Sequence, residues 1–376
     1  MTWQITSRSR GFPLKVLTRT WSKYSYIFVF AIILLMYALT IISNGNGFNF
    51  GHISSILSSQ HTVIVGAMAI GMAMVIITGQ IDLSIGSALV LCTGVCISVY
   101  NVTGGNVLLM ILAALGSGLI CGLINGLLVG YAKMPAFIVT MGTMLIYRSL
   151  TLSVVRDMDP AITGSTSSQF SMISDHSSYD FLRMQFGTGK LPIGPLTIPY
   201  IFFLFVALTV FFIFLLAKTK FGKSVYAVGS NEKTARLTGI NVERVKVSVF
   251  ALTGLLVGVA SFMQAWKMSI VTPASSAVSY EMYAIAAVVL GGVNMAGGRG
   301  KILGVFFGAL SYATINIIIN NIHGLSTDMQ NAFQGMVLIL VILIQTVGPV
   351  LKEKFRSLRK HMVKAEAKPE GEEEKV

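Results

Sequence analysis

The chain contains a series of apolar runs, most of them long enough to cross a lipid bilayer. Crossing about 30 Å of hydrocarbon takes roughly twenty helical residues, and fewer where protein shields the helix. Ten such runs occur, the third and eighth of them short: 24–42, 62–78, 87–100, 107–130, 136–154, 198–216, 247–268, 282–293, 302–319 and 333–350. Only 11% of the residues are charged, against about 25% in a soluble domain. We therefore expect an all-α polytopic membrane protein with about ten transmembrane helices, two of them broken or short.

The charges between these runs predict which side of the membrane each connection faces. The N-terminal arm 1–23 and the connection 217–246 are rich in Lys and Arg, whereas 43–52 and 101–106 contain none. Because Lys and Arg favour cytoplasmic loops, ten alternating spans within 24–350 put both termini in the cytoplasm and the loop 155–197 outside. The polar tail 351–376 is predicted to be a disordered cytoplasmic end. The net charge of +13 then reflects topology, and no nucleic acid partner is expected.

One carboxylate, Asp82, lies between the second and third runs, in the stretch ITGQIDLSIGS. An unpaired charge in hydrocarbon is costly, so this residue needs partners. By the loop count it precedes the third run, where an Asp can accept hydrogen bonds from the free N–H groups of the first turn and meets the positive end of the helix dipole. We favour this capping role, and direct handling of a solute or proton is the alternative. Gly79 and Gly86 would allow the bend.

A second break resembles the first. The stretch LGGVNMAGGRG ends a short apolar run and leads into the next one through Gly291, Gly292, Gly297, Gly298 and Gly300. It does not follow a predicted strand, and no GxxxxGK[ST] loop occurs in the chain, so a nucleotide site is rejected. We also expect no catalytic site, because a G-x-S-x-G elbow is missing and the five His are scattered.

Small and polar residues mark the apolar runs. Glycines recur four residues apart at Gly118, Gly122, Gly126 and Gly130, at Gly254 and Gly258, and at Gly300, Gly304 and Gly308. Such stripes favour close helix packing within the chain, with a dimer seam or a sliding surface as the alternative. Neutral amides within or beside the runs are candidates for the lining of a path for a neutral, hydroxyl-rich solute, although amides also bridge helices: Asn125, Gln264, Asn294 and Asn316. Cys92, Cys96 and Cys121 lack nearby His and predict buried thiols, not a metal site.

The basic connection 217–246 contains a candidate docking element. Asn231 can cap a short helix starting at Glu232, Gly239 can stop it, and Asn241 can cap the next helix. Ala235, Leu237 and Ile240 give this segment an apolar element where no lipid-spanning role exists. A short cytoplasmic helix of this kind suits docking into a groove on another protein, and a solvated basic loop is the alternative.

Together these stretches resemble the monosaccharide permeases of bacterial ABC importers, the ribose, xylose and galactoside group of the branched-chain amino acid and sugar permease superfamily. The segment Gly79–Ser87 is similar to the family pattern G-G-I-D-L-S-x-G-S, with Asp82 and Ser84 in place and Gln80 for the second glycine. Three further motifs follow in the family's order, at Met134–Met144, Ala227–Ile240 and Glu281–Gly300. The resemblance covers roughly residues 50–350, and the 155–197 loop is longer than usual.

The resemblance implies a multi-pass permease subunit of the bacterial inner membrane, with 24–350 as its permease domain. Its partners would be an ATPase subunit, an extracytoplasmic sugar-binding protein and a second permease copy, and it would move a sugar by alternating access. Neither a cofactor nor a metal ion is expected. The ATPase-coupling element would comprise Asn231, Glu232, Ala235, Leu237, Gly239 and Ile240. The alternatives are a stand-alone secondary transporter or channel, or an ABC permease for branched-chain amino acids, nucleosides or a furanosyl signal.

Overall fold

The computed structural model describes residues 25–322, except 44, 46 and 48, and a few residues beyond (326, 329–330, 332–336, 339–340 and 343). The chain divides into two compact units that part after Asn321, and the fold below is that of the first unit. The predicted cytoplasmic arm 1–23, most of the predicted span 333–350 and the predicted disordered tail 351–376 lie outside the described residues.

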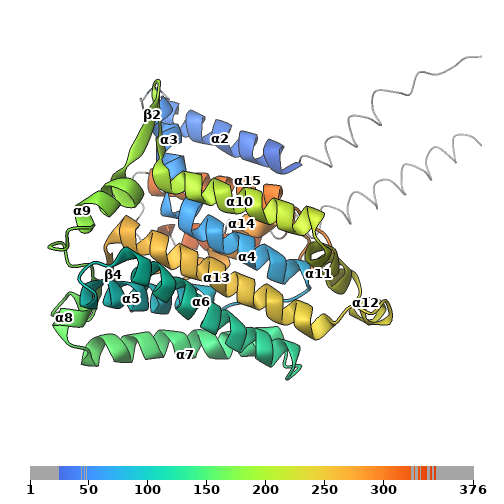
Figure 1. Ribbon diagram of the computed structural model, residues 1–376. Helices are drawn as coiled ribbons and strands as arrows, with labels where there is room; N and C mark the ends of the chain where they lie inside the picture. Colours follow the sequence, from blue (N-terminus) through green and yellow to red (C-terminus); the bar gives the residue numbers. More distant parts are fainter. Residues whose placement is uncertain are drawn as a thin grey trace, which may run out of the picture. The chain divides into compact units, whose positions relative to one another are not determined.

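Apolar helices lying side by side build this unit (Figure 1). They are α2 (Ser25–Ser43), α3 (Phe50–Ser58), the π-helix η1 (His61–Val65), α4 (Gly66–Ile77), α5 (Ile85–Val102), α6 (Val107–Gly130), α7 (Ala136–Asp157), α10 (Tyr200–Lys218), α13 (Val242–Met268), α14 (Tyr280–Leu290) and α15 (Ile302–Asn320). The described residues include six helices long and apolar enough to cross a membrane, namely α5, α6, α7, α10, α13 and α15. The pair Phe50–Ser58 and His61–Ile77, bent by 51°, would make a seventh. The predicted helical membrane fold is confirmed, whereas the count of ten spans is not.

The predicted loops contain more structure than their sequences indicate. The 155–197 segment folds into α8 (Pro160–Thr163), β1 (Phe170–Ser171), α9 (Tyr179–Leu182), the π-helix η2 (Arg183–Thr188) and β2 (Lys190–Ile193), followed by β3 (Leu196–Pro199). Strand β2 pairs antiparallel with β3, and β1 pairs with β4 (Ile270–Val271). The connection 217–246 is helical over most of its length, with α11 (Lys220–Ser230) and α12 (Glu232–Leu237). The predicted short helix from Glu232 is present as α12, whereas α11 was not predicted, because a polar helix this short is not marked by an apolar run.

Helix α4 lies in the core, and every one of its residues is buried. The glycine stripe of α6 packs against α13 within the same chain. A Cβ on Gly118 would lie 2.9 Å from the Cα of Gly258, and one on Gly122 would lie 2.9 Å from the Cα of Gly254. Gly304 and Gly308 of α15 meet the end of α14 in the same way, at Gly291 and Ala287. The predicted packing role of these stripes is therefore confirmed.

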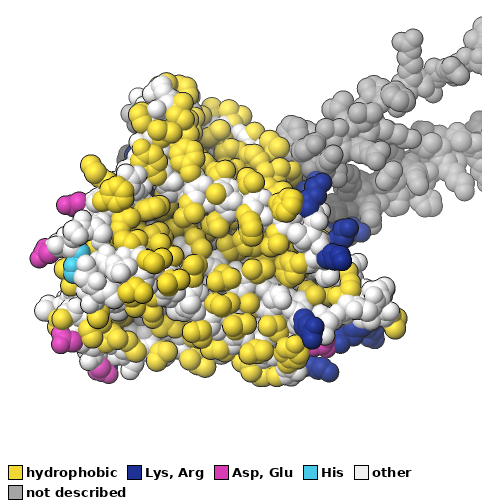
Figure 2. All heavy atoms as spheres, in the orientation of Figure 1, with side chains coloured by type: hydrophobic (Ala, Val, Ile, Leu, Met, Phe, Trp, Pro, Cys, Tyr) yellow, Lys and Arg dark blue, Asp and Glu magenta, His cyan; other side chains and the backbone are white. Residues whose placement is uncertain are grey.

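Charged side chains gather at the two ends of the helices. In the space-filling view, Lys and Arg lie beside α11 and α12, and most of the visible Asp and Glu lie at the other end, near α8 and α9 (Figure 2). The band between them on this face is apolar or uncharged (Figure 2). Charges confined to the two ends, with Lys and Arg concentrated at one of them, are typical of a protein that spans a membrane.

Candidate coupling site and helix breaks

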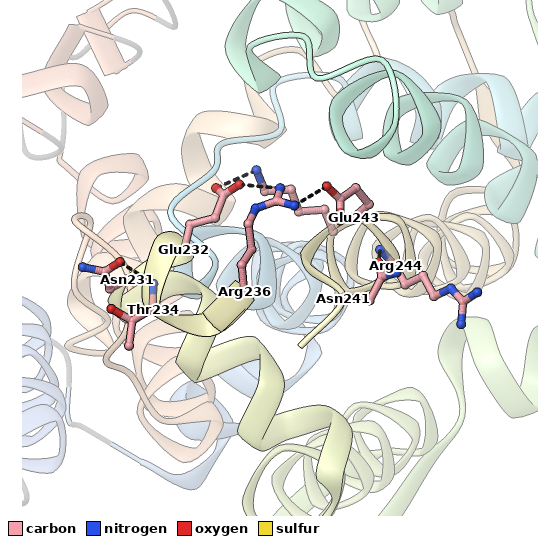
Figure 3. Close-up of polar contacts among 8 residues, drawn as sticks. Asn231, Glu232, Thr234, Arg236, Asn241, Glu243 and Arg244 are labelled. Carbon is pink, nitrogen blue, oxygen red and sulfur yellow. Dashed lines mark hydrogen bonds and ion pairs between the residues drawn. The ribbon is translucent and has the colours of Figure 1, made fainter. Parts of the chain in front are cut away.

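Helix α12 is specified locally by its caps. The side-chain oxygen of Asn231 accepts a hydrogen bond from the N–H of Thr234 at 3.0 Å, and that of Asn241 caps α13 through the N–H of Arg244 at 2.9 Å (Figure 3). Gly239 has a φ of 82°, a left-handed conformation that suits glycine after a helix. Its N–H donates to the carbonyl of Arg236 at 3.0 Å. Both predicted caps and the predicted stop are confirmed.

The apolar residues of the segment 232–240 differ in exposure. Ala235 is buried against the bundle, Ile240 is half-buried, and Leu237 is 88% exposed. Of the three, only Leu237 presents a large apolar side chain to the surface.

Ion pairs join α12 to the start of α13. Arg236 contacts Glu232 at 3.1 Å and Glu243 at 2.5 Å, and the ammonium group of Lys246 lies 2.9 Å from Glu232 (Figure 3). Of these four residues only Glu232 was among the predicted coupling residues. The i,i+4 spacing of Glu232 and Arg236 could have revealed that pair, but the pairs to α13 depend on how the two helices meet.

We predict that these ion pairs weaken in acid. Partial burial alone would raise the pKa of the Glu232 carboxyl, but hydrogen bonds from Lys246 and Arg236 outweigh it and hold that pKa below its usual range. The unfolded pKa of a Glu carboxyl is about 4.3. Where the folded pKa lies lower, the carboxyl stabilises the fold fully above about pH 4.3, and this stabilisation is lost as the pH falls through the folded pKa. The protection of the backbone amides over 231–246, taken relative to their intrinsic exchange rate at each pH, should therefore fall below about pH 4.3. The effect should be small because the pairs are half-exposed.

The variant Glu232→Gln is the control for this experiment, because it removes the titrating group and keeps the shape of the side chain. Its exchange should lack the acid step attributed to Glu232. An identical acid response in the wild type and in Glu232→Gln would contradict the assignment.

A cavity of about 600 Å³ lies beside these ion pairs. Its lining includes Glu232, Arg236 and Lys246, together with Lys133 after α6 and Gln80 after α4. The coupling segment and the first helix break thus border the same space.

Both helix breaks and the end of α11 meet through their backbones, at a cluster that we call the glycine junction: Gly79, Gly229, Gly297 and Gly298. The N–H of Gly298 donates to the carbonyl of Ile77 at 2.8 Å. A Cβ on Gly297 would lie 3.1 Å from the Cα of Gly79, and one on Gly229 would fall on the carbonyl oxygen of Ile77 and 2.8 Å from the N of Gly298. Gly79, Gly297 and Gly298 all have positive φ.

The sequence predicted the two breaks separately, but not that they meet or that Gly229 joins them. Gly229 lies inside a helix, and nothing local distinguishes it from a surface glycine. The remaining glycines of the breaks either adopt a positive φ in a turn or allow a close contact with a neighbouring residue. Gly292 has a φ of 76°, Gly291 contacts Gly304, Gly300 faces Val293, and Gly86 faces Glu281.

Asp82 is 3% exposed, and its carboxylate accepts hydrogen bonds from a residue close in the sequence. One of its oxygens accepts hydrogen bonds from the N–H of Ser84 at 2.9 Å and from its hydroxyl at 2.7 Å. The N-cap residue of α5 is Ser84, which makes no side-chain capping bond within the described part of the chain. The expectation that Asp82 caps the first turn was therefore wrong in detail, because its carboxylate closes the turn just before the helix.

Asn125 extends this cluster to α6 and α7. Its amide nitrogen donates to the hydroxyl of Ser84 and its oxygen accepts from the hydroxyl of Thr143, both at 2.8 Å. The other amides lie elsewhere. The Asn294 oxygen accepts from the N–H of Ala296 at 3.1 Å, and that of Asn316 accepts from Asn320 at 3.1 Å. The Oε1 of Gln264 is buried without a hydrogen-bond partner among the described residues. A path-lining role for these four amides stays a prediction.

We predict that Asn125→Leu lowers the free energy of unfolding by about 2 kcal/mol, because two buried hydrogen bonds between three elements are lost. Asn316→Leu is the matched control, since it removes only one bond within a single helix and should cost less than about 1 kcal/mol. Denaturant titration in detergent measures both variants. Equal losses would contradict the bridging role of Asn125, and reduced uptake at unchanged stability would favour contact with the solute.

The cysteines and the acids form no metal site in the part of the chain that the structure describes. Cys92, Cys96 and Cys121 are free and buried, as predicted. No group of three or more His, Cys, Asp or Glu among those residues is placed to hold a metal ion.

Apolar helices long enough to cross a membrane, two helix breaks that meet at the glycine junction and a basic end (Figure 2) are the features of a membrane protein of the permease class. The family described as the permease component of the branched-chain amino acid transport system matches residues 53–342, and the chain belongs to it.

Several curated relatives cover most of the chain. The ribose import permease protein RbsC of Escherichia coli K12 is 34% identical over 345 residues, 92% of this chain and 98% of the relative. Its namesake in Bacillus subtilis 168 is 38% identical over 285 residues, covering 76% and 82%. The xylose transport system permease protein XylH of Escherichia coli K12 is 30% identical over 363 residues, covering 84% and 90%. No solved structure matches the chain.

Proposed function

We propose that the protein is the permease subunit of an ATP-driven ABC importer of the bacterial inner membrane, and that it translocates a monosaccharide delivered by a binding protein. The relatives named for ribose and xylose support a pentose-like solute over an amino acid. The single observation that carries the mechanism is the glycine junction, because it puts the end of α11 against both helix breaks.

The basic end would face the cytoplasm, with both termini inside and ten spans in all. There α12 would dock into a groove of the ATPase subunit through Leu237, the most exposed of its apolar side chains. ATP binding and hydrolysis would move α12 together with α13, to which the ion pairs join it. The movement would reach the two breaks through α11, and a second permease copy would complete the pathway.

The main alternative is a carrier driven by an ion gradient. Such carriers usually keep titrating groups inside the helix bundle. Here Asp82 is engaged by Ser84, whereas Glu281 at the start of α14 is half-buried, so uptake measured with the ion gradients collapsed separates the two classes. The sequence has no GxxxxGK[ST] loop, which supports a separate chain as the site of ATP hydrolysis.

The proposal predicts that Leu237→Glu impairs coupling without disturbing the fold. A central apolar anchor of an interface contributes about 2 kcal/mol, so its loss should weaken ATPase docking about thirtyfold. Co-purification with the ATPase subunit and ATP-driven uptake into vesicles measure the effect.

The control is Leu191→Glu in the hairpin at the opposite end, where the same substitution of an exposed leucine should leave ATPase docking unchanged. Unchanged docking of Leu237→Glu would contradict the coupling role of α12.

A further inference from the structure

The chain between β4 and α14, residues 272–279, is irregular. Ala277 and Ser279 have positive φ values of 53° and 64°, which are uncommon for residues with a Cβ. Helix α14 then has only 11 residues, about 16 Å, or half of a membrane crossing. The irregular segment therefore supplies the other half of this crossing.

The contacts of Arg148 place this segment at mid-depth. Arg148 comes twelve residues after the start of α7 at Ala136 and nine before its end at Asp157. Its guanidinium donates to the carbonyls of Pro273 at 2.7 Å, Ser276 at 2.8 Å and Ala277 at 3.4 Å. The first turn of α5 also lies against the segment, because a Cβ on Gly86 would be 3.1 Å from the carbonyl oxygen of Ala277.

The segment reaches the surface of the described unit at this depth. Ala274 and Ser275 are exposed, Val278 is 51% exposed, and the ionisable side chains of Arg148 and Glu281 beside them are half-buried. Irregular backbone at membrane depth is tolerated only where it is covered by protein or lines a water-filled cavity. Ionisable side chains at that depth likewise face a bundle interior or water. This face therefore does not suit contact with lipid, unlike the face drawn in Figure 2, where the charges lie at the ends.

We propose that the face formed by Arg148, Ala274, Ser275, Val278 and Glu281 lines the water-filled route of the solute. This inference rests on the proposed function and deepens it. Arg148 is a positioning residue, since three carbonyls of the segment accept hydrogen bonds from it. Glu281 and Ser275 offer a carboxylate and a hydroxyl to the hydroxyl groups of a neutral sugar.

The test is the reaction of single cysteines with a membrane-impermeant thiol reagent, in the assembled transporter with its ATPase and binding protein. The parent chain carries Cys92→Ala, Cys96→Ala and Cys121→Ala and must retain pentose uptake. Ser275→Cys is the test variant. Val210→Cys is the control, because Val210 is 60% exposed near the middle of α10 and should face lipid. We expect Ser275→Cys to react at least tenfold faster than Val210→Cys and the modification to block uptake.

Equal, slow reaction of the two cysteines would overturn the proposal, as would rapid modification of Ser275→Cys that leaves uptake intact. Slow reaction of the reduced Ser275→Cys with the reagent, together with oxidative crosslinking of two copies through this cysteine, would show a dry interface and would also overturn it. Absence of pentose uptake by the wild-type assembly would refute the proposed function instead, so the two failures are distinguishable.

Discussion

Gly229→Ala is expected to reduce ATP-driven uptake at least tenfold. Alanine favours a helix over glycine by about 1 kcal/mol, so α11 itself should not suffer. The added Cβ, however, would fall on the carbonyl oxygen of Ile77 and 2.8 Å from the N of Gly298. These are backbone atoms and cannot rotate away, so α11 must separate from both helix breaks. The hydrogen bond from Gly298 to Ile77 would be strained or lost. Uptake of labelled pentose and ATPase activity of the complex measure the consequence.

Gly142→Ala is the control for this prediction. Gly142 is also a helical glycine, but a Cβ there would meet nothing within 4 Å in the described structure. The Gly142→Ala variant should transport pentose at the rate of the wild type. We further expect the ATPase activity of the Gly229→Ala complex to lose its response to the loaded binding protein. Coupled uptake by Gly229→Ala at the normal rate would show that the glycine junction does not transmit movement.

Gly122→Leu is expected to destabilise the folded protein by about 3 kcal/mol or more, the upper range for overpacking a core. A Cβ at this position would fall on the carbonyl oxygen of Phe250 and 2.9 Å from the Cα of Gly254. Helices α6 and α13 would have to part along a seam of four glycines in α6. Denaturant unfolding in detergent and the yield of monodisperse protein measure the loss.

Gly116→Leu tests whether that loss comes from the seam or from the residue type. Gly116 belongs to the same helix, and no atom of the described residues lies within 4 Å of a Cβ built on it. This variant should be as stable as the wild type or slightly more stable, because leucine is the better helix former. Similar losses in both variants would contradict the packing role of the stripe.

The apolar runs predicted the positions of the long helices well, because a long hydrophobic run has few alternatives to a helix in a membrane. The caps Asn231 and Asn241 predicted where α12 and α13 begin, since capping is local. Helix α11 of the 217–246 segment was missed, because it is short and lacks an apolar run.

Contacts between distant segments could not be predicted from the sequence. The glycine junction joins residues more than 200 positions apart, and no local pattern records which turns meet. Similarly, Asp82 was assigned to the correct break, but its partner Ser84 and the bridge through Asn125 depend on how α6 and α7 pack there.

Vesicles containing the purified chain, with and without its ATPase subunit and binding protein, give the most direct test of a permease driven by a separate motor. We expect labelled ribose or xylose to accumulate only when both partners and ATP are present. This accumulation should continue when the ion gradients are collapsed. Accumulation by this chain alone, driven by a proton or sodium gradient, would contradict the account.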